Sequence, residues 1–210
     1  VKQLQPSGSV FGVRQRGPPR ATPKPSSAAS EEDKGQPWTL AGRIQGRSDI
    51  PLAPESEQLT REAGKKLRPL PDAAFCSPLV RAKRTAELLL EGTGITPVID
   101  ERLVERDFGA LDGKTYDELG LPDHTRLFYV LDEAIGAERS EDVYSRVRSF
   151  LDDIGARYDG KRVLVVSHGV CISYLAYALT HDRWNPADYT LEYIKNLAII
   201  ERTYAGGTKQ

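Results

Sequence analysis

The fold is decided by the stretch Arg162-Val163-Leu164-Val165-Val166-Ser167-His168-Gly169. Its mostly β-branched apolar residues are typical of a fully buried strand, and a helical pattern from Val170 to Leu179 follows at once. His168 therefore falls on a strand-to-helix turn, which is where ligands bind in open α/β sheets. Because the amides of a helix N-terminus favour an anion, this histidine indicates phosphate chemistry. The alternative is a histidine that only caps the helix.

Composition limits the possible function classes. The chain has 210 residues and a net charge of -1, which suits one domain with a sizeable core. No basic stripe accompanies stacking aromatic residues, so we expect no nucleic-acid partner. No apolar run approaches the roughly 20 residues that cross a bilayer, so we expect no membrane partner. Cys76 and Cys171 end or follow apolar strands, and we expect buried reduced thiols that neither pair nor bind metal.

The N-terminal segment differs from the rest of the chain. Residues 1–36 are rich in Pro, Ser, Ala and Gly and are expected to be disordered, although Val10-Phe11-Gly12-Val13 could form a short strand. Residues 37–210 are expected to form the globular domain. The first 30 residues hold five basic and no acidic side chains, so organellar targeting is an alternative to a cytoplasmic location. The sequence contains no methionine, from which we expect a fragment, a processed product or an incomplete gene model.

The globular part alternates between helical and strand patterns. This alternation predicts a largely parallel sheet covered on both faces. Ser77 and Pro78 suit the N-cap and the first position of a helix. The predicted helices span 54–67, 77–90, 140–158 and 169–180, and the predicted strands span 73–76, 97–99, 162–167 and 197–202.

Two basic segments are candidates for binding an anion. Glycines in the loop Gly42–Leu52 allow its backbone to approach a ligand closely, although the segment taken alone favours a solvated surface turn. Arg81 falls on the first turn of a helix that begins at a strand end. The helix dipole and the planar guanidinium then favour an anion at the same place. Lys83 and Arg84 are expected to be solvated surface charges.

One carboxylate is a candidate general acid. Glu105 precedes Phe108 and Gly109, and burial beside an apolar ring and a glycine turn would raise its pKa. A carboxyl group with a raised pKa could donate a proton to a leaving alkoxide. The alternative is an exposed glutamate in a loop.

Taken in chain order, four segments resemble the histidine phosphatase superfamily, the phosphoglycerate-mutase-like phosphatases. The resemblance covers roughly 38–203 and implies a three-layer α/β/α sandwich around a mostly parallel sheet. It also implies phosphomonoester hydrolysis, or phosphoryl transfer within one substrate, without a metal or other cofactor. The segments that carry it are Gly42–Leu52, Ser77–Glu87, Glu105–Gly109 with Gly113-Lys114-Thr115-Tyr116, and Val163–Gly169.

The resemblance also implies roles for particular residues. Arg81 matches an arginine that clamps the phosphate, and His168, assisted by the turn at Gly169, matches a histidine that donates to the phosphoryl oxygens. Glu105 matches the acid that protonates the leaving oxygen. Gln45 and Gly46 match a loop near the substrate. The expected partner is a small phosphorylated substrate or phosphate, whose spreading charge such a site stabilises. No pattern in the sequence predicts an oligomeric state.

The defining motif of that family, Arg-His-Gly at the end of the first strand, does not occur in this sequence. Its histidine is the nucleophile. Asp33-Lys34-Gly35 stands near the expected place, and nothing around Lys34 suggests a covalent lysine. A second candidate, Val13-Arg14-Gln15-Arg16-Gly17, lacks a nucleophile as well. His124 and His181 are expected to be surface residues.

Three explanations follow: a mis-assembled N-terminus, a pseudoenzyme that keeps its phosphate pocket, or an unorthodox nucleophile. The leading expectation is a phosphomonoester hydrolase for a small phosphorylated metabolite, impaired because the nucleophile is missing. The alternative is a non-catalytic module that binds phosphate or a phospholigand. An unstable fragment is a third option, because losing a central strand leaves backbone groups unpaired. The insert at about 117–139 is expected to set specificity.

Overall fold

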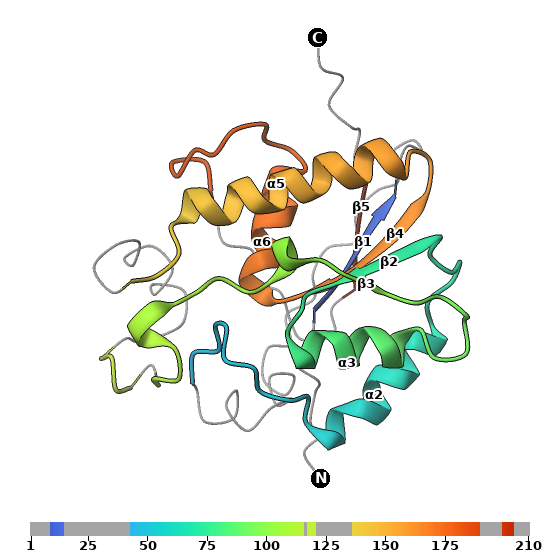
Figure 1. The fold of residues 1–210 in the computed structure, drawn as a ribbon, viewed down its shortest axis with the longest axis horizontal. Coiled ribbons are helices and arrows are strands. Elements are labelled where there is room, and N and C mark those ends of the chain that lie inside the picture. The colour runs from blue at the N-terminus through green and yellow to red at the C-terminus, as the bar shows by residue number, and fades with distance from the viewer. Residues whose placement is uncertain (1–8, 15–42, 116, 121–135, 190–198, 204–210) are drawn as a thin grey trace, which may run out of the picture.

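The described residues form a five-stranded sheet with helices on both faces (Figure 1). The structure is a computed structural model that describes residues 9–14, 43–115, 117–120, 136–189 and 199–203. The strands are β1 (Ser9–Arg14), β2 (Ala73–Cys76), β3 (Val98–Ile99), β4 (Arg162–Ser167) and β5 (Ile199–Thr203). The helices are α2 (Pro54–Lys65), α3 (Val80–Leu89), α5 (Ser140–Arg157) and α6 (Gly169–Ala178), with 3-10 turns η1 (Glu101–Leu103) and η2 (Gly109–Leu111).

The strands lie in the order β3-β2-β4-β1-β5. β2 runs parallel to both β3 and β4, and β1 runs parallel to β5. Only the central pair of β1 with β4 is antiparallel. The sheet is therefore mostly parallel by its pairs, as predicted, but β1 and β5 point in the opposite direction to the other three strands.

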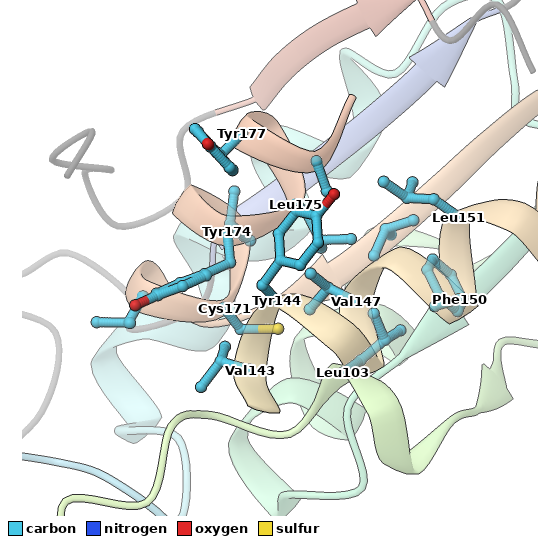
Figure 2. Packing of buried hydrophobic residues seen from close by; sticks show 14 of the residues in the cluster. Leu103, Val143, Tyr144, Val147, Phe150, Leu151, Cys171, Tyr174, Leu175 and Tyr177 are labelled. Carbon is cyan, nitrogen blue, oxygen red and sulfur yellow. The ribbon is translucent and has the colours of Figure 1, made fainter. Parts of the chain in front are cut away.

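Alternation along β4 builds a core on each face of the sheet. Val163 and Val165 pack with side chains of α5 and α6, while Leu164 and Val166 pack with α3. Figure 1 shows the corresponding layers, with α5 and α6 on one side of the sheet and α2 and α3 on the other. Figure 2 shows how closely the buried side chains of α5 and α6 fill the larger core. The three-layer α/β/α sandwich is confirmed.

The predicted start of the helix after β2 is wrong by two residues. We expected Ser77 to be the N-cap, but α3 begins at Val80 with Leu79 as the N-cap. The Ser77 amide instead donates to the Val166 carbonyl at 3.0 Å, which continues the chain alongside β4. The Val80 amide is satisfied from another segment, by Oδ1 of Asp49 at 2.6 Å. A long-range carboxylate therefore replaces the local serine cap.

Residues Ser9–Arg14 form β1 between β4 and β5, so the short strand allowed at Val10–Val13 is confirmed and is longer than expected. A central gap would leave the facing backbone groups of both neighbours unpaired, and β1 pairs them. The first strand is thus replaced rather than absent. Residues 1–8 and 15–36 lie outside the described residues, so disorder there stays a prediction.

The direction of β1 places Arg14 away from the candidate site. Ser9 pairs with Ser167, whereas Arg14 pairs with Arg162 at the other end of β4. Six strand residues span about 17–20 Å. Arg14 therefore lies at the far end of the strand from His168, and residues 15–17 of the candidate segment lie outside the described residues.

Candidate active site

The candidate site lies where β2 and β4 end, because parallel strands bring their carboxyl ends to one edge of the sheet. His168 follows β4 directly and is the N-cap of α6. Ser77 follows β2, and its Oγ lies 2.7 Å from Nε2 of His168. Both residues are buried, with 0% and 5% of their surface exposed for Ser77 and His168. The histidine is thus held from the neighbouring strand, a contact that the sequence did not reveal.

Arg81 is held by the loop that the sequence singled out. Its Nη1 donates to the Ser48 carbonyl at 2.8 Å and its Nη2 to the Gly46 carbonyl at 2.9 Å. The guanidinium is buried on the first turn of α3, as predicted. Its orientation is therefore set by two backbone carbonyls, which leave the net positive charge of the group uncompensated by a direct ion pair among the described residues.

Gly46 is where the loop needs a glycine. A Cβ at this position would lie 3.0 Å from the Phe108 ring and 3.1 Å from the Arg106 carbonyl. The loop thus packs against the acid motif through its own backbone, and the close approach expected of its glycines is made to protein atoms.

Asp112 fixes the same loop from the other side, and sequence reasoning missed it. Its Oδ1 accepts the Gly46 amide at 2.9 Å, and its Oδ2 accepts the amide and hydroxyl of Ser48 at 3.1 and 3.0 Å. These are the residues whose carbonyls bind Arg81. The available signal was weak, since Asp before Gly113 suggests only a turn.

Glu105 is buried and accepts three backbone hydrogen bonds. Oε1 accepts from the amides of Arg106 and Cys171, each at 2.9 Å, and Oε2 accepts from Val170 at 3.2 Å. Burial raises the pKa of Glu105, against these three amides and the charge of Arg81. The direction is the one expected of a general acid, and the exposed-loop alternative is wrong.

The three charged or polar groups of the pocket lie close enough to influence one another. Burial lowers the pKa of His168 well below its usual range, and the charges of Arg81 and Arg146 add to the effect. Burial also lowers the pKa of Arg81, against the carboxylates of Glu105, Asp49 and Asp112. The His168 ring is therefore neutral at neutral pH.

The N-terminus of α6 is already partly occupied. Glu105 uses the amides of Val170 and Cys171, so the turn offers fewer free donors than its sequence suggested. Among the described residues the Gly169 amide has no hydrogen-bond partner, and a Cβ at Gly169 would meet nothing within 4 Å. Gly169 is thus the place on this turn with room for a ligand.

A second carboxylate, Glu138, ties the acid motif to its surroundings. Its oxygens bind the Arg146 guanidinium at 2.8 and 3.1 Å, and Oε2 also lies 3.1 Å from Nη2 of Arg47. Its backbone pairs with Asp107 at 2.9 Å and accepts from Nε of Arg106 at 2.9 Å. No local pattern marks Glu138, because Arg106 lies 32 positions before it and Arg146 lies 8 positions after it.

The structure brings together Arg81, Glu105, His168, Gly46 and Gly169, as the sequence predicted. Gln45 lies beside Gly46 in the loop and is half-buried. The remaining predicted positions fall outside this group. Arg84 pairs with Glu57 on the surface, as expected; His181 is half-buried and stacks on Tyr177 rather than being fully exposed; and Gly42, Lys34, Tyr116 and His124 lie outside the described residues.

Over the part of the chain that the structure describes, no three His, Cys, Asp or Glu side chains are grouped so as to hold a metal ion. Over the same part, no helix has the length and apolar character needed to cross a membrane. Cys76 and Cys171 are free and buried, as expected.

Comparison with known proteins identifies the family. The model of the histidine phosphatase superfamily (branch 1) matches residues 35–210, which is well over half of the chain. The chain belongs to the histidine phosphatase superfamily. This superfamily assignment confirms the resemblance drawn from the four segments, and the match begins after most of the segment expected to be disordered.

Relatives within the superfamily include enzymes named as mutases and as phosphatases. The "Probable phosphoglycerate mutase GpmB" of Erwinia tasmaniensis is 31% identical over 144 residues, covering 66% of this chain and 67% of that protein. The "Uncharacterized phosphatase PhoE" of Bacillus subtilis is 34% identical over 139 residues, covering 66% and 69%. The solved structure of Bacillus stearothermophilus YhfR superposes with a TM-score of 0.65 at 27% identity, covering 90% of this chain and 87% of that one.

Proposed function

We propose that this chain binds the phosphate group of a small phosphorylated metabolite between Arg81, His168 and Gly169. We further propose that it is a phosphomonoester hydrolase by lineage whose turnover is impaired. The observation that carries the proposal is that the buried Arg81 guanidinium lies close enough to the buried His168 ring, at the N-cap of α6, for its charge to lower the pKa of His168. Two backbone carbonyls orient the guanidinium without neutralising its charge, and a phosphate would supply the opposite charge.

The arrangement suits charge that spreads over phosphoryl oxygens. Arg81 is held in place by two carbonyls, so its remaining N–H groups are oriented before a ligand arrives. His168 adds a neutral donor, and the Gly169 amide adds another at the positive end of the helix dipole. In this proposal Glu105 supplies a proton to the leaving oxygen, and burial raises its pKa in the direction that a general acid needs.

The impairment follows from the missing nucleophile. The sequence contains three histidines and no Arg-His-Gly. Among the described residues, His168 is the one histidine at the site, and its Nε2 is engaged with Ser77. The arginine of the alternative motif, Arg14, lies at the opposite end of the β1–β4 pair. A helper histidine and an acid without a nucleophile stabilise phosphate but do not form a phosphohistidine.

A hydrolysis assay tests this proposal. The chain is incubated with p-nitrophenyl phosphate over a range of pH, beside a version whose β1 is replaced by a strand parallel to β4 that ends in Arg-His-Gly. We expect background hydrolysis by the natural chain and a gain in the grafted one that His168→Ala abolishes. Arg84→Ala in the grafted chain is the control, since Arg84 of α3 pairs with Glu57 of α2 at the surface. Activity of the natural chain that survives His168→Ala contradicts the assignment.

A second candidate function is phospholigand binding with no turnover. The observation that favours it is that both carboxylate oxygens of Glu105 already hold the start of α6, so the acid also serves as a structural cap. Calorimetry with sugar phosphates separates the two candidates. Saturable binding by a grafted chain that still lacks hydrolysis supports the binding module, and hydrolysis by the grafted chain supports the enzyme.

A further inference from the structure

We propose that the Ser77 hydroxyl is a positioning group that holds His168 in the neutral tautomer with its proton on Nδ1. In this tautomer Nε2 accepts from Ser77 and Nδ1–H is the donor that the ring offers to a ligand. The inference rests on the proposed phosphate pocket and assigns the donating atom within it.

The position of Ser77 is fixed independently of the histidine. Its amide donates to the Val166 carbonyl at 3.0 Å, which ties the residue to β4 two positions before His168. Its Oγ accepts the Leu79 amide at 3.3 Å, in the turn that leads into α3. The Oγ atom therefore stands 2.7 Å from Nε2 because two strands and a turn place it there.

Counting donors and acceptors decides the direction of this hydrogen bond. A serine hydroxyl has one hydrogen to donate and two lone pairs to accept with. The Leu79 amide uses one lone pair, and the hydrogen needs an acceptor because Ser77 is 0% exposed. Nε2 of His168 is the acceptor found for it among the described residues. If the ring donated instead, the buried hydroxyl hydrogen would have no acceptor, which is the costly arrangement.

The charge state of the ring agrees with this direction. A doubly protonated imidazole has no lone pair and could not accept from Ser77. Burial and the nearby charges of Arg81 and Arg146 hold the pKa of His168 well below its usual range, so the ring is neutral at pH 7. A neutral ring that accepts at Nε2 carries its single proton on Nδ1.

The same contacts argue against Ser77 as a replacement nucleophile. A serine hydroxyl within hydrogen-bond reach of a histidine is otherwise the signature of an activated nucleophile. Here Ser77 has no exposed surface, and its Oγ also accepts a hydrogen bond from the Leu79 amide. Ser77 acts through His168, and it does not contact the phosphate.

Nuclear magnetic resonance of the ring nitrogens tests the inference directly. The chain contains only three histidines, so the protein labelled with ¹⁵N-histidine is assigned by His124→Gln and His181→Gln variants. We expect His168 to show a protonated Nδ1 and an unprotonated Nε2 at pH 7. Ser77→Ala should convert this signal to a mixture of tautomers, and Ser77→Thr, which keeps the hydroxyl, should retain it. A protonated Nε2 in the natural chain overturns the inference, whether or not the variants fold.

A ligand titration keeps this inference distinct from the proposed function. We expect inorganic phosphate to shift the Nδ1–H signal of the natural chain and Ser77→Ala to weaken phosphate binding about tenfold. Ser173→Ala is the matched control, because Ser173 is equally buried in α6 and its hydroxyl accepts from Tyr189 at 3.0 Å. The expected tautomer with no phosphate response contradicts the proposed function, whereas phosphate binding with a protonated Nε2 contradicts the role of Ser77. Unchanged phosphate affinity in a folded Ser77→Ala also contradicts that role.

Discussion

Oε1 of Glu105 accepts the backbone amide of Cys171 at 2.9 Å, although the two residues are 66 positions apart. This bond joins the acid motif to the first turn of α6, the helix that His168 caps. The carboxylate takes the place that a side-chain cap at the N-cap would normally fill, since His168 makes no capping hydrogen bond. The proposed acid and the proposed helper histidine are therefore parts of one hydrogen-bonded unit.

Glu105→Gln tests this unit. A glutamine amide keeps one oxygen for two of the amide donors but turns an NH₂ group toward the third. We expect a loss of about 1–3 kcal/mol in the free energy of unfolding, the cost of leaving a buried donor unsatisfied. Urea denaturation measures it. Glu141→Gln, on the exposed first turn of α5, is the control and should change stability by less than about 0.5 kcal/mol. Equal effects of the two substitutions contradict the capping role.

Asp112→Asn tests how the loop holds Arg81. The substitution replaces one carboxylate oxygen by a donor that faces the amides of Gly46 or Ser48. Because the carbonyls of these residues orient the guanidinium, we expect phosphate affinity to fall about tenfold. Calorimetry measures the affinity, and Asp152→Asn on the surface of α5 is the control. An unaltered affinity in Asp112→Asn shows that the loop does not set the position of Arg81.

Gly46→Ala and Gly169→Ala test whether the first glycine is closely packed and the second faces open space. A Cβ at Gly46 meets the Phe108 ring at 3.0 Å, so we expect a loss of about 1–3 kcal/mol. A Cβ at Gly169 meets nothing within 4 Å and sits on the first helical residue, so stability should be unchanged or slightly higher. Thermal unfolding of both variants checks the pair. A loss of stability in Gly169→Ala together with unchanged stability in Gly46→Ala would contradict the packing described for the loop.

The depressed pKa of His168 predicts a loss of stability in acid. The unfolded histidine takes up a proton near pH 6.5, whereas the folded one does so only well below that value. As pH falls below 6.5, protonation therefore favours the unfolded chain, by up to about 1.4 kcal/mol per pH unit. Glu105, whose pKa is raised, acts in the opposite direction above its unfolded value of 4.5. The difference between the natural chain and His168→Gln isolates the histidine, and we expect the variant to gain relative stability as pH is lowered. Stability that changes with pH in the same way in both proteins would contradict a depressed pKa of His168.

Local patterns were sufficient for the elements that carry the site. The buried run of β4, the turn at His168 and the first-turn position of Arg81 each depend on residues next to one another in sequence. The order of the family's motifs along the chain then grouped Arg81, Glu105 and His168, which the structure brings together. The sequence was therefore sufficient to identify these three residues of the candidate site.

The supports of the pocket could not be predicted in the same way. Ser77 pairs with His168 across 91 positions, and Asp112 with Gly46 across 66. Such bonds satisfy whichever backbone or ring atom the fold presents, so no spacing rule marks them. The direction of β1 could not be predicted either. The hydrophobic pattern of a strand does not distinguish a parallel neighbour from an antiparallel one. That direction removed Arg14 from the site.

Calorimetric titration of the full chain with inorganic phosphate tests whether Arg81 and His168 form a phosphate site. We expect saturable binding that is kept in Arg84→Ala and weakened at least about tenfold in both Arg81→Ala and Arg81→Lys, which loses the planar fork. Circular dichroism confirms that each variant is folded. Phosphate binding that is indifferent to both Arg81 substitutions, or no binding by the folded natural chain, would contradict the existence of a phosphate pocket at Arg81 and His168.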